Sequence, residues 1–85
     1  MTLHRDKVGI AVRTVIADVL GIPHNCITDR TDLRAEYGID SLEVMAVAAQ
    51  LERVLELRVA VEALVQVRTV GDAVDALTDR QEAGV

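Results

Sequence analysis

The stretch Tyr37-Gly38-Ile39-Asp40-Ser41-Leu42, followed by a helical run from Glu43 to about Leu57, decides how the rest of this chain is organised. Asp40 is a preferred N-cap residue, and Glu43 completes an Asp-x-x-Glu variant of the capping box. Gly38 supplies the backbone freedom for a tight turn. The pattern predicts a helix that begins at Ser41, where free N–H groups and the positive end of the helix dipole suit a phosphate on the hydroxyl.

The chain before this stretch is predicted to form a helix and a long connection. Apolar residues recur on one helical face from Leu3 to Leu20, and Gly21 with Pro23 ends the pattern. Residues 22–39 form the connection, in which we expect a single helical turn from Asp32 to Glu36. Three spaced apolar residues should pin this connection to the core: Ile22, Ile27 and Leu33.

The helix that follows Ser41 carries apolar residues on two sides. One side has the spacing of a core face: Val44, Val47, Ala48, Leu51, Val54 and Leu55. The other side is also apolar near the serine: Leu42, Met45, Ala46 and Ala49. Because so small a domain cannot bury every side of a helix, we expect the second group to form a contact surface beside Ser41.

The remaining segments complete an all-α domain. Residues 57–67 fit a strand or a short helix, and the lack of a partner strand nearby favours the helix. Thr69-Val70-Gly71-Asp72 has the pattern of a capping box and predicts the start of a last helix. Residues 81–85 are expected to form a frayed tail. We predict one domain, residues 1–85, with a structured core of about 4–79. Its fold is a four-helix bundle with three longer helices, a short third one, and a long loop between the first two.

Composition excludes several classes of function. The chain has no apolar run of membrane-spanning length and no signal-peptide pattern. A net charge of −5 and a single aromatic residue argue against nucleic-acid binding. Cys26 is the lone cysteine, which fits a reducing, cytoplasmic location and reads as a half-buried apolar residue.

The sequence gives no support for catalysis or metal binding. Gly38 to Leu42 does not match the G-x-S-x-G pattern of serine hydrolases, and both histidines, His4 and His24, precede the serine. These histidines have no companion ligands at metal spacing. The segment from Asp29 lacks the glycine that a calcium loop requires. A helix-turn-helix is disfavoured because neither candidate recognition helix is basic.

Gly38-x-Asp40-Ser41-Leu42 at the start of a helix resembles the attachment motif of acyl carrier proteins and of carrier domains in polyketide and peptide synthases. The resemblance runs without obvious gaps from about Val8 to Leu77. It includes Leu20-Gly21-Ile22 at the end of the first helix and Thr69-Val70 at the start of the last. The motif alone is weak, and the surrounding pattern makes it specific.

The resemblance implies a non-catalytic carrier. Ser41 would receive 4′-phosphopantetheine from coenzyme A through a phosphopantetheinyl transferase, and the thiol of that arm would hold acyl groups as thioesters. Asp40 and Leu42 would flank the attachment site. Acyltransferases, ketosynthases or other acyl-handling enzymes would read one face of the second helix: Glu43, Met45, Ala46, Ala49, Glu52 and Arg53.

Departures from the family pattern bear on the pathway. Ala46 and Arg53 stand where fatty-acid carriers commonly have carboxylates, which weakens recognition by basic partner patches and favours apolar contact. We therefore expect polyketide or other secondary-metabolite biosynthesis, with fatty-acid synthesis as the alternative. A helical adaptor without a prosthetic group is the competing class. We expect a free-standing monomer. The sequence does not decide whether the chain self-associates. It also does not decide whether a short acyl chain fits between the helices.

Overall fold

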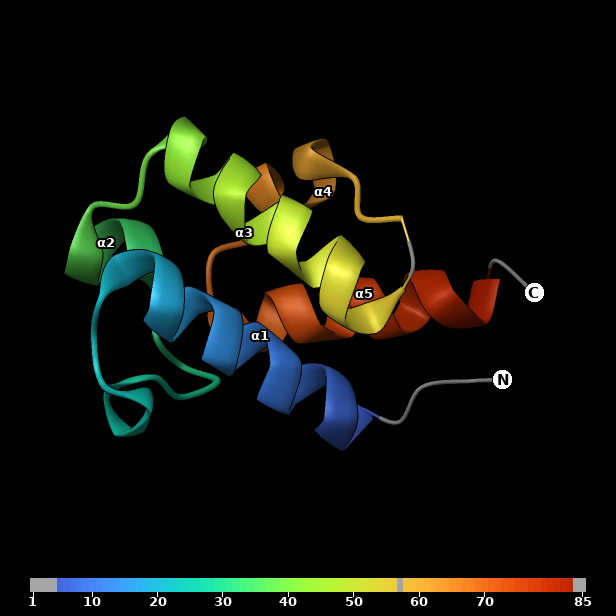
Figure 1. Cartoon of the computed structure of the whole chain (residues 1–85), viewed down its shortest axis with the longest axis horizontal. Helices are drawn as coiled ribbons and strands as arrows, with labels where there is room; N and C mark the ends of the chain where they lie inside the picture. Colours follow the sequence, from blue (N-terminus) through green and yellow to red (C-terminus); the bar gives the residue numbers. More distant parts are fainter. Residues whose placement is uncertain (1–4, 57, 84–85) are drawn as a thin grey trace.

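The computed structural model describes residues 5–56 and 58–83, and for residues 79–83 the backbone alone. Its helices are α1 (Arg5–Leu20), the 3-10 helix η1 (His24–Cys26), α2 (Leu33–Tyr37), α3 (Ser41–Leu55), α4 (Val61–Gln66) and α5 (Val70–Ala83). The predicted all-α class is confirmed (Figure 1). Among the described residues, none of the helices combines the length and the hydropathy of a membrane-spanning segment.

The helices enclose one core. α1 packs against both α3 and α5, and α4 packs against α3 and α5 from the other side. Figure 1 shows α2 at the end of the molecule where α3 begins, with both chain termini at the opposite end. The innermost side chains come from three helices: Val8, Val12 and Ile16 of α1, Leu51 of α3, and Val70 and Val74 of α5.

The four predicted helices are α1, α3, α4 and α5, and the predicted single turn is α2. The ambiguous segment is helical over Val61–Gln66, as favoured. Two boundaries were predicted wrongly. α3 ends at Leu55 because Glu56 takes the left-handed conformation, with φ 54°. α5 continues through Ala83, three residues into the expected tail. The predictions for residues 1–4, 57 and 84–85 lie outside the described residues.

Two predicted side-chain positions were wrong. Val54 was placed on the core face, but it is 59% exposed. At about 100° per residue it lies roughly 80° from Val44, beyond the edge of the buried stripe. Cys26 was expected to be half-buried, but it is exposed at the end of η1, a short 3-10 helix with no buried residue.

The long connection is ordered by apolar anchors and by charge. Ile27 is buried, and Ile22 and Leu33 pack against the core as predicted. The Asp29 carboxylate pairs with Arg5 at 3.6 Å and Arg13 at 3.3 Å, both on α1. Arg5 also donates to Asp75 on α5 at 2.7 Å, and this hydrogen bond raises the pKa of Arg5. These exposed pairs contribute little stability; two of them join the connection to α1, and the third joins α1 to α5.

The start of α5 is joined to the same connection. Thr69 and Asp72 form the predicted capping box, with the Asp72 N–H donating to Thr69 Oγ1 at 3.1 Å. The Val70 N–H donates to the Thr31 carbonyl at 3.0 Å, and the Gly71 N–H to the Asp29 carbonyl at 2.8 Å. A Cβ at Gly71 would lie 3.0 Å from that carbonyl oxygen, so the close approach requires glycine. The connection is therefore fixed just before it enters α2.

Candidate functional site

The turn that leads to Ser41 is built by α2 and its two caps. Asp32 Oδ1 accepts hydrogen bonds from the N–H groups of Arg34 and Ala35 and so caps the start of α2. Gly38 ends α2 in the left-handed conformation, with φ 62°, and its N–H donates to the Arg34 carbonyl at 3.1 Å. The chain therefore reverses within a few residues and enters α3 at a fixed angle.

The predicted capping box at α3 is present in full. Asp40 Oδ1 accepts from the Glu43 N–H at 2.8 Å, and Glu43 Oε1 accepts from the Asp40 N–H at 3.1 Å. Ser41 is the first residue of α3, and its side chain is exposed. The first N–H groups of a helix have no intrahelical acceptor and carry the positive end of its dipole. An anion esterified to the Ser41 hydroxyl would therefore lie in a favourable electrostatic position.

A depression of about 190 Å³ lies beside the serine. It is lined from three helices and the turn between them: Arg34, Ile39, Asp40, Ser41, Val44 and Val65. Three of these lining residues are apolar, and Arg34 is the cationic side chain among them. The depression gives a group attached at Ser41 a defined surface to lie against.

Sequence reasoning missed Arg34 as a residue of this site. Its guanidinium Nη2 donates a hydrogen bond to the Val65 carbonyl in the last turn of α4. A cation at the C-terminal end of a helix satisfies carbonyls that have no intrahelical donor. The contact joins α2 to α4 across 31 residues of sequence. Local patterns in the sequence could not have indicated it.

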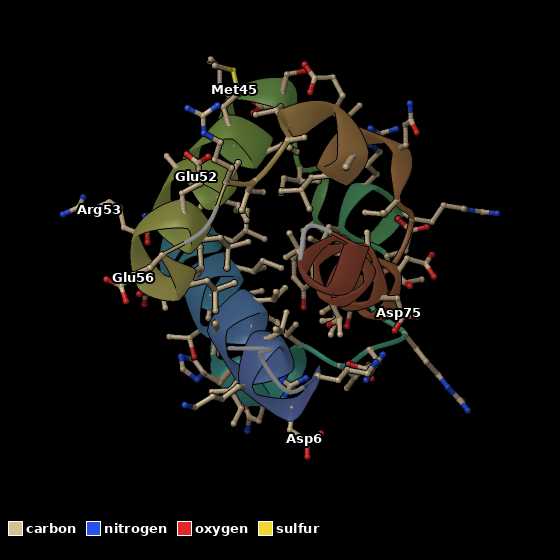
Figure 2. All side chains as sticks on the ribbon, turned by 90° about the vertical axis from the view of Figure 1, so that its right-hand side faces the viewer. Asp6, Met45, Glu52, Arg53, Glu56 and Asp75 are labelled. Carbon is tan, nitrogen blue, oxygen red and sulfur yellow. The ribbon has the colours of Figure 1, made fainter. Side chains whose placement is uncertain are left out.

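The outer side of α3 is exposed and mainly apolar, as predicted. Leu42 is 75% exposed and Met45 53% exposed, and Ala46 and Ala49 are exposed beside them. Figure 2 shows Met45, Glu52 and Arg53 projecting from α3, far from Asp75 on α5. This apolar flank (Leu42, Met45, Ala46 and Ala49) starts next to Ser41.

Two carboxylates that were predicted to contact partner enzymes accept hydrogen bonds from backbone N–H groups of this chain. Glu43 is half-buried and closes the capping box with Asp40. Glu52 Oε2 accepts from the Val59 N–H at 2.9 Å and so holds the connection between α3 and α4. Arg53 is exposed, and no ion pair is found for it among the described residues. The face beside Ser41 therefore offers partners more apolar surface than free negative charge.

A small, mainly apolar cavity of about 50 Å³, partly open to solvent, extends between the helices. Side chains from α1, α3 and α4, among them Val12, Leu51 and Leu64, line its interior. Arg34 and Ile39 line both this cavity and the depression at Ser41, so the two spaces are neighbours. Among the described residues, no three His, Cys, Asp or Glu side chains are grouped as a metal site requires.

Comparisons with known proteins agree with this geometry. Residues 11–77 match the family model described as a phosphopantetheine attachment site. The chain is similar to an acyl carrier protein of Saccharopolyspora erythraea, with 32% identity over 77 residues that cover 91% of this chain and 81% of that protein. It is also similar to an acyl carrier protein of Coprothermobacter proteolyticus, with 28% identity over 75 residues (88% and 92% of the two chains).

A third relative is much longer. A non-reducing polyketide synthase of Emericella nidulans is 36% identical over 66 residues, which cover 78% of this chain but 3% of that protein. The comparisons favour a carrier over the adaptor class. Proteins of this family are non-catalytic, and their cofactor is covalently attached 4′-phosphopantetheine. Because the family model spans most of the chain, including the whole segment from α2 to α4, this protein belongs to the phosphopantetheine-bearing acyl carrier family.

Proposed function

We propose that Ser41 is the attachment residue and that the protein carries acyl intermediates of polyketide or other secondary-metabolite biosynthesis. The observation that carries the assignment is the exposed hydroxyl at the first position of α3, held there by the Asp40–Glu43 capping box. Ser41 is also the only serine of the chain.

The residues around Ser41 fit a phosphodiester and a long arm. Free N–H groups at the helix start favour the negative charge of the phosphate. The depression beside the serine is lined by both apolar and polar residues, and Arg34 is one of them. Ser41 is exposed to solvent, and so is the apolar side chain of its neighbour Leu42. When bound, the arm supplies a terminal thiol that carries acyl groups as thioesters.

Attachment requires a transferase, and the chain contributes only the nucleophile. The Ser41 oxygen forms a bond to the phosphorus of the pantetheine phosphate in coenzyme A, and the bond from that phosphorus to the nucleotide breaks. The nucleotide leaves, and the serine proton passes to a base supplied by the transferase. Asp40 is occupied by the Glu43 N–H, so its part is to fix the helix start that presents the hydroxyl.

Incubation with coenzyme A, Mg²⁺ and a promiscuous phosphopantetheinyl transferase tests the attachment. Intact mass should increase by one phosphopantetheinyl group in the wild type and in Thr14→Ala, which removes a hydroxyl from α1. Ser41→Ala should remain at its starting mass and keep the helical circular dichroism of the wild type. An unchanged mass in the wild type would refute the assignment.

The pathway proposal rests on the chemistry of the apolar flank. Glu43 and Glu52 are engaged with backbone N–H groups, and Arg53 adds positive charge to α3. A partner with an apolar socket suits this face better than one with a strongly basic patch. Exchange discriminates the pathways. If a fatty-acid ketosynthase elongates on this carrier as efficiently as on its own, the preference for secondary metabolism is wrong.

A further inference from the structure

The carboxylates around Ser41 are all used by backbone N–H groups. Asp32 caps α2, and Glu36 Oε2 accepts from the Asp32 N–H at 2.8 Å. Asp40 and Glu43 cap α3 through each other's N–H groups. Arg34 lies among these acids, but no ion pair joins it to a carboxylate of the described residues. Its positive charge is therefore not neutralised by the acidic side chains nearest to it in sequence.

The Arg34 guanidinium is also held in place. Its hydrogen bond to the Val65 carbonyl orients it from α2 towards α4, so part of the entropy of fixing this long side chain is already lost. An arginine has several N–H donors in a planar fork, and the bond to Val65 uses one of them. The remaining donors match the geometry of phosphate oxygens.

Such a cation would further stabilise a phosphodiester at Ser41. The chain has a net charge of −5, and Asp40 directly precedes the serine. The helix dipole offsets part of the repulsion, but it is shared with the Asp40 cap. Arg34 lines the same depression as Ser41, on the side of α4. Among the described side chains, no other arginine or lysine lines that depression.

We propose that Arg34 is a positioning residue that binds the phosphodiester of the arm once it is attached to Ser41. The guanidinium keeps its bond to Val65 and adds charge-assisted bonds to the phosphate, and so directs the base of the arm over the α2–α4 side of the molecule. The apolar flank of α3 stays free for partner enzymes. This inference rests on the proposed attachment at Ser41.

Nuclear magnetic resonance of the wild type tests the contact directly. Conversion from the apo to the holo protein should shift the Arg34 Nε–Hε resonance, and the ³¹P resonance of the arm should move with salt concentration. Arg58, in the connection that follows the far end of α3, provides the internal reference and should not shift. α3 has 15 residues and is roughly 22 Å long, so Arg58 lies outside the reach of the phosphate.

Variants separate the phosphate contact from the structural role of Arg34. Arg34→Gln should return the ³¹P shift and its salt dependence to those of a phosphopantetheinylated peptide, whereas Arg58→Gln should match the wild type. The holo protein should melt at a higher temperature than the apo protein in the wild type and in Arg58→Gln. That difference should disappear in Arg34→Gln, even though the lost Val65 bond lowers both melting temperatures.

The outcomes distinguish this inference from the function on which it rests. If intact mass shows no arm on the wild type, the attachment proposal fails and the inference with it. If the arm is present but the Arg34 resonance does not move, only the inference is overturned. An Arg34→Gln variant whose ³¹P resonance equals that of the wild type would overturn it as well. Should Arg34→Gln fail to fold, the wild-type resonances still decide.

Discussion

Asp40 and Glu43 cap each other: the Asp40 carboxylate accepts from the Glu43 N–H at 2.8 Å, and the Glu43 carboxylate accepts from the Asp40 N–H at 3.1 Å. This reciprocal pair sets the first residue of α3 and therefore the position of Ser41. The Asp40 and Glu43 side chains that fix the start of α3 therefore also fix the position of the Ser41 hydroxyl, the candidate attachment group.

Asp40→Ala should destabilise the protein by about 1 kcal/mol, because one N–H at the start of α3 loses its acceptor. Asp18→Ala, at an exposed position of α1, should change stability by less than about 0.5 kcal/mol. Urea unfolding measures both. Since the two carboxylates act as a unit, the double variant with Glu43→Ala should cost less than the sum of the single changes. Simple additivity would argue against the reciprocal cap.

Glu56→Gly should stabilise the protein by about 0.5 to 1 kcal/mol. Glu56 ends α3 with φ 54°, a conformation that costs a residue with a Cβ more than it costs glycine. For a domain of this size the melting temperature should increase by a few degrees. The matched control is Glu62→Gly within α4, which should destabilise by about 1 kcal/mol. A lower melting temperature for Glu56→Gly would contradict the geometry at this position.

Leu42→Ala and Met45→Ala should weaken reactions with partner enzymes without weakening the fold. Both side chains are more than half exposed, so their truncation should change stability by less than about 0.5 kcal/mol. If they are anchor residues of the interface, kcat/KM of a cognate ketosynthase or transferase should decrease by about tenfold. Ile10→Ala is the control, because Ile10 is 60% exposed on α1. An equal decrease in the Ile10 variant would remove the special role of the apolar flank.

An acyl chain that enters the bundle should change the amide resonances of residues lining the interior cavity, such as Val12, Leu51 and Leu64. The cavity of about 50 Å³ has room for only about three to five water-sized groups. The shifts should therefore increase with length over the shortest acyl chains, and longer chains should also move α4. Resonances that do not respond to chain length would show that the small residues of α3 serve close helix packing instead.

The features predicted correctly from sequence are those that local chemistry determines. The Asp40–Glu43 and Thr69–Asp72 capping boxes each depend on residues within four positions, and both are present. The turn at Gly38 likewise needs only a residue that tolerates positive φ. Such features place Ser41 at the start of α3 without any knowledge of the tertiary structure.

The features that sequence reasoning missed depend on contacts between distant segments. Val54 has helical spacing from Val44, but the width of the buried stripe is set by how α1 and α4 pack on α3. Glu52 was predicted to lie on the face that partner enzymes contact, but the connection after α3 brings the Val59 N–H within hydrogen-bond distance of its carboxylate. Arg34 joins the site only because the tertiary structure brings the Val65 carbonyl at the end of α4 within reach of its guanidinium. No period or motif in the sequence indicates that contact.

The most direct measurement of the central claim locates the added group after transfer from coenzyme A. Trypsin should release residues 35–53 as one peptide, whose side-chain hydroxyls are those of Tyr37 and Ser41. Fragmentation of that peptide should place one phosphopantetheinyl group on Ser41, with fragments that contain Tyr37 but not Ser41 unmodified. A group on Tyr37, on another peptide, or on none would contradict the account.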